Sequence, residues 1–281
     1  MKKVLKNKQC FYGGIILLTI ILLGIVYPII SPNDPSAISS LDRFKPISKS
    51  FPLGTDSFGR CIFTRIAVGT KYSLGISFVI MINIFIISLL IGTIPTYLGG
   101  KYDRIFVSIC DVIMAFPQMV FVFVLIGIMG KGIGNLMLSM IVSQSPWYAK
   151  FVRGYVLEEK NKGYIKAAIA AGSSSLEIIL RHIIPNILPQ FIVYISVGMG
   201  RIILELSAFS FLGFGVSSKV AEWGVMLNES RRYIFLHPQL MLYPGLFIFA
   251  TSIGFNLLGD GLRDLFDKKR GDGDINVSIK Y

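Results

Sequence analysis

Long apolar runs separated by short polar segments make up most of the chain. The hydrocarbon core of a bilayer takes about 20 mostly apolar residues per helix, and six runs meet that length. They cover residues 11–30, 73–98, 105–129, 135–155, 187–214 and 240–258. The third run contains Asp111 and Pro117, and the fourth is the most polar, with Gln144, Pro146 and Lys150. The pattern predicts an all-α integral membrane protein with six transmembrane helices.

Composition supports a membrane location. Of the 281 residues, 53% are hydrophobic and 16% are charged, whereas soluble domains carry about 25% charged residues. The net charge of +12 fits the concentration of Lys and Arg in cytoplasmic loops, and no basic patch interleaved with aromatic residues predicts a nucleic-acid partner. The cysteines, Cys10, Cys61 and Cys110, form no C-x-x-C pair, so neither a disulfide framework nor a metal site is predicted.

The charge distribution orients the chain. A basic tail, residues 1–10, precedes the first run; this run is too long for a signal-peptide core and lacks an A-x-A site, which favours an uncleaved anchor. Lys and Arg are more frequent in the segments that share a side with this tail, which predicts that both termini are cytoplasmic. The remaining parts are an outer loop (31–72), a five-helix core (73–268) and a tail (269–281) predicted to be disordered. Gly259 and Gly261 predict the end of the last helix.

A polar segment, residues 157–189, lies between the fourth and fifth runs. Its first half, "YIKAAIAAG", predicts a helix that ends at Gly172. Ser174 and Glu177 form a capping-box pattern that starts a second helix, which Pro185 and Pro189 interrupt. The apolar face of this second helix is predicted to contain Leu176, Ile179, Leu180, Ile183 and Ile184. An alternative is a helix that rests on lipid headgroups.

Ionisable residues inside the runs need an explanation, because charges in a bilayer are costly. Arg201 and Glu205 are four residues apart and can pair along one helix face, either against other helices or along a translocation path. Asp111 can reach the cytoplasmic interface or pair with a basic residue, and a structural or gating role is favoured over substrate binding. No catalytic motif and no Walker A loop are present, so energy for transport would come from a partner.

The stretch "KAAIAAGSSSLEIILRHIIPNILP" resembles the EAA loop of ABC-importer permeases. Ala167, Ala168, Gly172 and Pro185 fall on the family pattern, whereas Lys166 replaces its leading glutamate and Ile184 its leucine. "GTDSFGR", "DVIMAFPQMV", "SFLGFGV" and "NLLGDGLRD" are similar, in the same order, to permeases for dipeptides, oligopeptides and nickel, especially the second of the two permease subunits. The resemblance implies a type I ABC-importer permease fold with a cytoplasmic coupling helix. It assigns the ATPase-coupling loop to Lys166, Ala167, Ala168, Gly172, Ser174, Glu177, Arg181 and Pro185.

The resemblance also implies the partners. These are a homologous second permease, two ATP-binding subunits that use ATP and Mg, and an extracytoplasmic substrate-binding protein, in a bacterial cell membrane; the chain itself would bind no cofactor and catalyse no reaction. Peptide is the first expected substrate, and nickel or a metal–metallophore complex is the alternative. An ion-coupled secondary transporter would need no ATPase. A membrane-embedded enzyme such as an intramembrane protease would need a second aspartate to act with Asp111.

Overall fold

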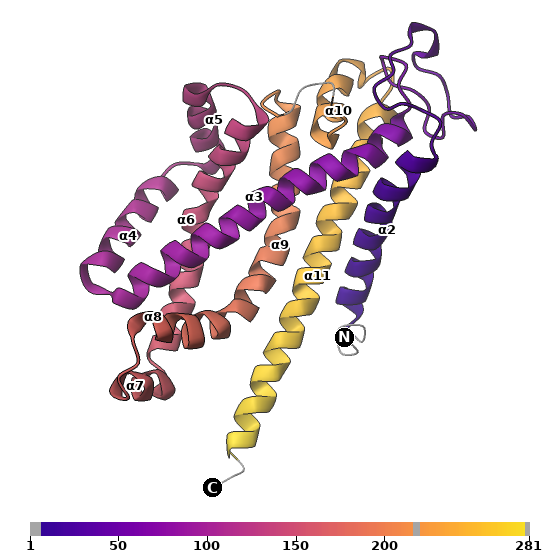
Figure 1. Ribbon diagram of the computed structural model, residues 1–281. Helices are drawn as coiled ribbons and strands as arrows, with labels where there is room; N and C mark the ends of the chain where they lie inside the picture. Colours follow the sequence, from indigo (N-terminus) through magenta and orange to yellow (C-terminus); the bar gives the residue numbers. More distant parts are fainter. Residues whose placement is uncertain (1–6, 216–219, 279–281) are drawn as a thin grey trace. The chain divides into compact units, whose positions relative to one another are not determined.

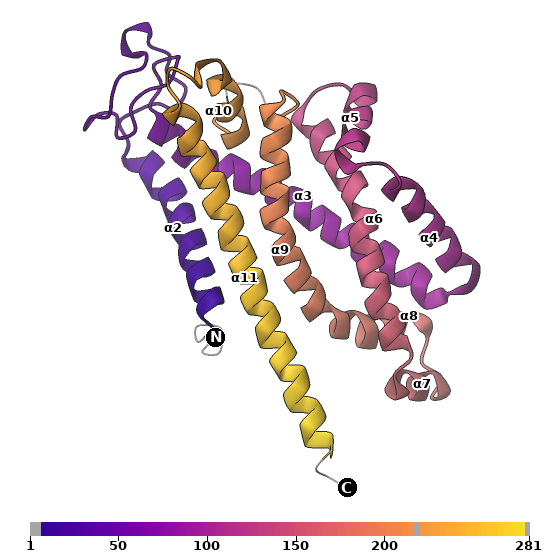
Figure 2. The same ribbon diagram turned by 180° about the vertical axis from the view of Figure 1, so that it is seen from behind.

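The computed structural model describes residues 7–215 and 220–278, with side chains described up to residue 266. Residues 1–6 of the predicted N-terminal tail and residues 279–281 of the predicted C-terminal tail lie outside this range. Within it the structure is helical, apart from loops, short helical turns and one isolated bridge between Thr55 and Cys61 (Figures 1 and 2). The α-helices are α2 (Lys8–Ile30), α3 (Ile62–Leu98), α4 (Gly100–Met114), α5 (Gln118–Met129), α6 (Ile133–Lys160), α7 (Gly163–Ala170), α8 (Ser175–Ile178), α9 (Ile184–Phe211), α10 (Trp223–Ser230) and α11 (Gln239–Ser278).

Among the residues that the structure describes, four continuous helical segments are long and apolar enough to cross a bilayer. They are α2, α3, the segment Ser175–Phe211 that includes α9, and Gln239–Phe266 of α11. Helices α4 and α5 are long and apolar enough only when taken together, and the angle of the bend between them is 88°. The run 105–129, predicted as one span, therefore consists of two helices with a sharp bend between them. Pro117 explains the break, because its ring disfavours a helical conformation in the preceding residue and it has no amide hydrogen to continue the ladder.

One of two compact units consists of residues 1–79, 131–134 and 196–262. In this unit α2 packs directly against α11 at glycines. A Cβ atom placed on Gly13 would lie 2.7 Å from the carbonyl oxygen of Gly254, and one on Gly261 would lie 2.5 Å from Sγ of Cys10. Small residues let helix backbones approach closely in membranes, so these glycines set the spacing of α2 and α11.

The end of α11 differs from the prediction. Gly259 and Gly261 do not end the helix; they lie inside it, and a Cβ atom on Gly259 would meet Val197 of α9 at 2.5 Å. Helix α11 continues to Ser278 and so covers residues 269–278, for which the sequence predicts disorder. Glycine is compatible with a helix interior when a close neighbour needs its missing side chain, and packing here overrides the local stop signal.

The second unit consists of residues 80–130, 135–195 and 263–281. Gly92 of α3 lets α3 and α6 pack closely, because a Cβ atom there would lie 2.6 Å from the carbonyl oxygen of Ala149 in α6. Helix α9 joins this unit through stacked rings: Phe85 and Phe191 have centroids 5.0 Å apart, and Phe151 and Tyr194 have centroids 3.7 Å apart. These contacts fix the base from which the segment 157–189 projects.

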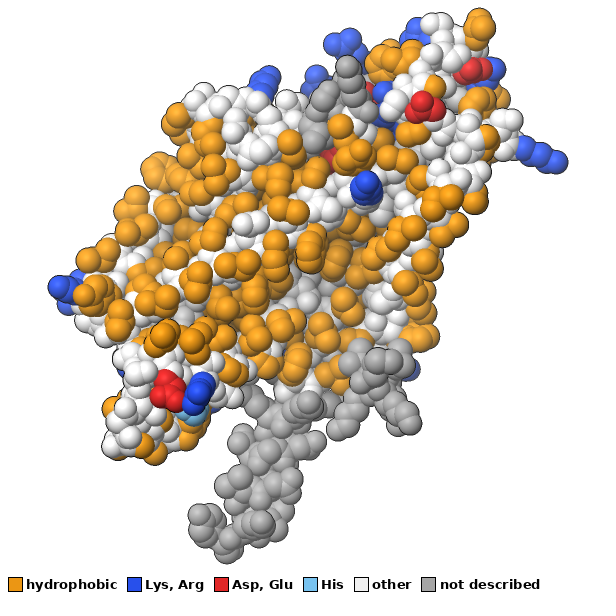
Figure 3. All heavy atoms as spheres, in the orientation of Figure 1, with side chains coloured by type: hydrophobic (Ala, Val, Ile, Leu, Met, Phe, Trp, Pro, Cys, Tyr) orange, Lys and Arg blue, Asp and Glu red, His pale blue; other side chains and the backbone are white. Residues whose placement is uncertain are grey.

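Hydrophobic side chains cover most of the face seen in Figure 3, and charged side chains lie mainly towards its margins. On α2, for example, Leu18, Ile25 and Ile29 are 57%, 58% and 78% exposed. Soluble monomers rarely expose contiguous apolar patches of more than a few hundred Å². The surface therefore fits a hydrocarbon environment and not water.

Candidate functional site

The segment predicted to couple transport to ATP hydrolysis contains a helix, a glycine turn and a second helix. Helix α7 ends at Ala170, and Gly172 follows with φ of +83°. The amide of Gly172 donates to the carbonyl of Ile169 at 3.0 Å, and the amide of Ser173 donates to that of Ala168 at 3.1 Å. These two bonds form a Schellman motif, whose left-handed position glycine occupies with least strain. The predicted left-handed cap at Gly172 is confirmed.

The second helix starts where the capping pattern predicts. Ser174 Oγ accepts a hydrogen bond from the amide of Glu177 at 3.3 Å, which caps α8. The Glu177 carboxylate is engaged by Arg181, whose Nη1 donates to it at 2.7 Å. Glu177 and Arg181 therefore form an i,i+4 pair on the exposed side of the segment.

The two prolines do not interrupt this helix, contrary to the prediction. A π-helical turn, Ile179–Ile183 (η2), joins α8 to α9, and Pro185 and Pro189 lie within α9. Because Pro185 has no amide hydrogen, it cannot donate to the carbonyl four residues earlier. The wider turn immediately before Pro185 keeps the helix continuous despite this missing donor.

The π-helical turn also changes which residues face inwards. Leu176 and Leu180 were predicted to share the apolar face, yet they are 66% and 55% exposed. Ile179 and Ile183 of the predicted face are buried as expected, and Ile178, which was not predicted, is buried with them. A π turn has more residues per turn than an α-helix, so spacing rules based on 3.6 residues assign the wrong face across it.

The opposite side of the segment forms an exposed surface of small and apolar side chains, which we term the outer face. Lys166 and Ala167 are exposed, Ala168 is half-buried, and Ile169 is 51% exposed. The outer face consists of Lys166, Ala167, Ile169, Ala170, Ala171, Leu176 and Leu180. Ile165 of α7 is fully buried beneath it. The segment is therefore anchored on one side and free to receive another surface on the other.

A polar group that sequence reasoning missed holds the base of α7. Glu159, at the end of α6, is only 4% exposed, and it accepts hydrogen bonds from the Tyr164 hydroxyl and from Lys162 Nζ, the latter at 2.6 Å. Asn186 Nδ2 of α9 donates to the same hydroxyl at 2.9 Å. Desolvation and the bond to the Glu159 carboxylate raise the pKa of Tyr164 to about 12, so the hydroxyl stays protonated as a donor. These contacts join α6, α7 and α9.

The ionisable residues predicted inside the apolar runs have partners. Asp111 of α4 pairs with Lys150 of α6, in agreement with the expectation of a basic partner. Asp103, eight residues before Asp111 on α4, accepts two hydrogen bonds from Arg153 of α6, each of 2.8 Å. These two ion pairs connect α4 to α6.

The predicted pair on the fifth run is also present. Arg201 Nε lies 2.9 Å from Oε1 of Glu205, four residues further along α9. The Arg201 side chain is 44% exposed and that of Glu205 is 16% exposed. The pair therefore neutralises two charges on one helix face. It belongs to the first unit, whereas Asp111 belongs to the second.

A buried cluster of four charges fixes the outer loop, and sequence reasoning did not find it. Arg60, from "GTDSFGR", lies 2.7 Å from both Asp56 Oδ2 and Glu229 Oε2. Arg65 of α3 lies 3.1 Å from the same Glu229 oxygen, with its side chain 1% exposed. Buried charges persist only when they are paired and hydrogen-bonded. The cluster thus joins the outer loop, α3 and α10.

A second buried carboxylate lies at the start of α10. Glu222, fully buried, caps the helix by accepting bonds from the amides of Gly224 and Val225 at 2.9 and 3.0 Å. Ser73 Oγ of α3 donates to Glu222 at 3.3 Å and accepts from the Trp223 amide at 3.1 Å. Burial raises the pKa of the Glu222 carboxyl, although the amide donors act in the opposite direction.

Comparison with known proteins identifies the family. The family model described as "Binding-protein-dependent transport system inner membrane component" matches residues 66–272. The chain belongs to this family of inner-membrane permeases.

Curated relatives of the permease carry different substrate names. It is 35% identical to the dipeptide transport system permease protein DppC of Alkalihalophilus pseudofirmus. The 268 aligned residues cover 95% of this chain and 88% of that protein. It is 34% identical to the nickel transport system permease protein NikC of Escherichia coli, over 84% of this chain and 85% of that one. It is 35% identical to the glutathione transport system permease protein GsiD of Pectobacterium atrosepticum, over 95% and 89%. The chain is thus an ABC-transporter permease and a multi-pass membrane protein.

The two signals that sequence reasoning missed in this permease were weak but visible. Arg65 is a lone charge in the apolar stretch "CIFTRIAVGT", and such a residue requires a buried partner. Its partner Glu229 is 164 residues away, so no local spacing rule could join them. Glu159 follows Glu158, and nothing in the sequence indicates which of the two adjacent glutamates is buried.

Proposed function

We propose that this chain is one of two permease subunits of an ATP-driven ABC importer for peptides. A homologous permease would complete the pore, two ATPase subunits would dock beneath the two permeases, and an extracytoplasmic binding protein would deliver the substrate. The segment 157–189 would be this chain's contact with the ATPases. ATP and Mg would act in the ATPases. Both termini and the segment 157–189 would be cytoplasmic, in a bacterial cell membrane.

The outer face carries this proposal. It presents small and apolar side chains with one cation, Lys166, on a helix pair whose other side is anchored through Ile165, Ile178 and the Glu159 group. An anchored helix pair moves as one body, so a force applied to its outer face would be passed to α6 and α9, the helices that flank it. Lys166 in place of the family's glutamate predicts that the surface it meets is acidic at that point.

A sixth span is proposed for α6, which is more polar than the other candidates. Its 28 residues would extend about 42 Å at about 1.5 Å per residue, longer than the roughly 30 Å hydrocarbon core. Its polar residues Ser139, Gln144 and Ser145 are at most 4% exposed. Polar side chains that face other helices are tolerated within a membrane. With the α4–α5 pair as one span, the total would be six.

Peptide is the proposed substrate because relatives for dipeptide and glutathione align over 95% of the chain. Nickel or a metal–metallophore complex is the alternative, supported by the relative named for nickel. Uptake of labelled peptides and metal chelates by membranes that carry the complete transporter would decide between them.

Gly172→Val tests the coupling role. Valine at φ of +83° is strained, by roughly 1–2 kcal/mol or more. Apart from its two chain neighbours, no residue has an atom within 4 Å of a Cβ atom added at Gly172, so the effect acts mainly through the turn. We expect membrane insertion and ATP hydrolysis to persist while ATP-driven uptake is largely lost. Gly172→Asn is the matched control, because asparagine tolerates the left-handed conformation.

Uptake by Gly172→Val at the rate of Gly172→Asn would contradict the coupling role. An ion-coupled secondary transporter is the rival class, and it would purify without nucleotide-binding subunits. If tagged chain extracted from its native membrane carries no ATPase, and uptake follows an ion gradient, the importer proposal fails.

A further inference from the structure

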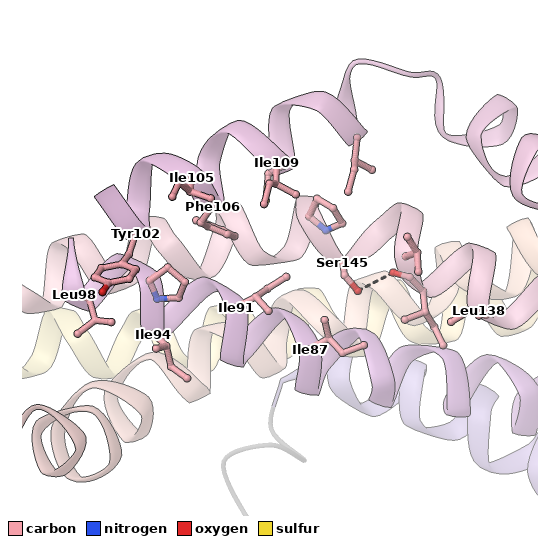
Figure 4. A pocket seen from close by; sticks show the side chains of 16 residues that line it. Ile87, Ile91, Ile94, Leu98, Tyr102, Ile105, Phe106, Ile109, Leu138 and Ser145 are labelled. Carbon is pink, nitrogen blue, oxygen red and sulfur yellow. Dashed lines mark hydrogen bonds between the residues drawn. The ribbon is translucent and has the colours of Figure 1, made fainter. Parts of the chain in front are cut away.

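An apolar groove lies within the second unit, between α3, α4 and α6. Its volume is about 560 Å³. The labelled side chains in Figure 4 converge on it from these helices. The lining residues are Ile87, Ile91, Ile94, Pro95, Leu98, Tyr102, Ile105, Phe106, Ile109, Cys110, Ile113, Leu138, Ile141, Val142, Ser145 and Pro146.

The groove is elongated. Ile87, Ile91, Ile94 and Leu98 line it along one face of α3, so it follows that helix for about 16 Å at about 1.5 Å per residue. Several lining side chains remain accessible: Ile94, Ile105 and Ile109 are 44%, 58% and 56% exposed. Apolar walls that lack contacts on one side lose dispersion energy, so in a bilayer an apolar occupant fills such a groove.

The lining favours an acyl chain over a neighbouring helix. Helix–helix contacts in membranes use Gly, Ala, Ser and Thr, which let backbones approach. Among the described residues that line the groove there is no Gly or Ala, and most are branched Ile, Leu or Val. A flexible hydrocarbon chain adapts to such irregular walls.

The end of the groove at the α3–α4 turn is positively charged. Tyr102 and Leu98 line this end, and Lys101 and Arg104 are exposed beside Tyr102 on the first turn of α4, with Lys101 Nζ 5.4 Å from the centre of its ring. Lys160 donates to the carbonyl of Tyr97 at 2.6 Å in the same region. The acid there, Asp103, is occupied by two bonds from Arg153. Lys101, Arg104 and Lys160 therefore give this end of the groove a net positive charge, and we call these three residues the cationic rim.

We propose that this groove binds an anionic phospholipid, with one acyl chain between α3, α4 and α6 and the phosphodiester at Lys101 and Arg104. Basic residues beside spaces between membrane helices recognise anionic headgroups, and charged hydrogen bonds from Lys and Arg to phosphate are strong. The apolar walls and the cationic rim each match one half of the same molecule. A second protein chain seated in the groove is the rival occupant.

The test compares lipid retention by the full-length chain and three variants. Each is purified in mild detergent, washed free of lipid, and equilibrated with equimolar phosphatidylglycerol and phosphatidylcholine of identical acyl chains, after which native mass spectrometry counts the bound lipid. Lys101→Gln combined with Arg104→Gln removes the two exposed cations proposed to bind the phosphodiester, and Val142→Trp fills the groove. Lys71→Gln, an exposed lysine of α3 outside the groove, is the matched control.

We expect the wild type and Lys71→Gln to retain phosphatidylglycerol in preference to phosphatidylcholine. The double variant should lose that preference by roughly 30-fold, because each basic residue near an anionic surface contributes roughly fivefold. Val142→Trp should exclude both lipids. Equal retention of the two lipids by the wild type would overturn the proposal, as would an unchanged preference in the double variant. Loss of a co-purified protein from Val142→Trp, with lipid retained, would assign the groove to that protein. The double variant changes only exposed side chains, so its result does not depend on folding.

Discussion

Removal of one carboxylate should release the outer loop from the four-charge cluster. Glu229 Oε2 lies 2.7 Å from Arg60 Nη2 and 3.1 Å from Arg65 Nη2, and both arginine side chains are at most 5% exposed. Glu229→Gln keeps the size of the side chain but leaves two buried cations facing the single charge of Asp56. The change isolates the charge of Glu229 from its packing.

The expected cost follows from the burial of these charges. Loss of one partner from a buried ion pair costs about 3–5 kcal/mol, because the remaining charge stays desolvated. An exposed pair contributes far less, because water and salt screen its charges. The pair between Lys45 and Asp42 in the same loop is such a case, with side chains 46% and 29% exposed. Asp42→Asn is therefore the matched control, because it makes the same charge change at an exposed ion pair of the loop that Glu229 holds in place.

Trypsin can measure this cost directly, because it cleaves after arginine and Arg60 is inaccessible until the cluster opens. For the protein in lipid nanodiscs, the rate of cleavage between Arg60 and Cys61, identified by the mass of the fragments, reports the open population when closing is fast. We expect Glu229→Gln to raise this rate at least about 100-fold and Asp42→Asn to change it by less than about fivefold. Equal rates for the two variants would refute the view that burial gives the cluster its strength.

Two further substitutions test the polar groups around α10 and α7. The raised pKa of Glu222 means that its contribution to stability is complete below its ordinary value of 4.5 and is lost as pH rises through the raised value. The thermal midpoint of the wild type should therefore fall as pH rises above 4.5, and that of Glu222→Gln should fall less. Parallel curves for the two proteins would contradict this assignment. Tyr164→Phe removes a hydrogen-bond donor to the buried Glu159 carboxylate and should destabilise the base of α7 by about 1–2 kcal/mol. Hydrogen exchange would detect this loss as roughly tenfold faster exchange of the α7 amides. Unchanged exchange would show that Lys162 alone satisfies Glu159.

The sequence predicted well those features that depend on neighbouring residues. The apolar runs located α2, α3, α9 and the first half of α11, because about 20 apolar residues have few stable alternatives to a membrane helix. Gly172 predicted a left-handed turn because few other residues adopt that conformation without strain. The ion pair between Arg201 and Glu205 followed from their i,i+4 spacing.

Features that depend on distant residues could not be predicted in this way. Gly261 carries a local signal for the end of a helix, but its contact with Cys10 turns it into a packing position. The π-helical turn before Pro185 shifts the buried face, so the α-helical spacing selected Leu176 and Leu180 wrongly. The cluster around Glu229 joins residues more than 160 positions apart, which one sequence without its relatives does not reveal.

The glycine contacts between α2 and α11 also constrain how the protein is made. Gly13 leaves the ribosome long before its partner, because the backbone it packs against at Gly254 is synthesised 241 residues later. At about 5–20 residues per second, that delay is roughly 12–48 s. Throughout this interval the first helix must wait in the bilayer, or beside an insertion factor, without its native neighbour. A ribosome that stalls before residue 254 therefore leaves an anchored but unpaired helix for the quality-control proteases of the cell.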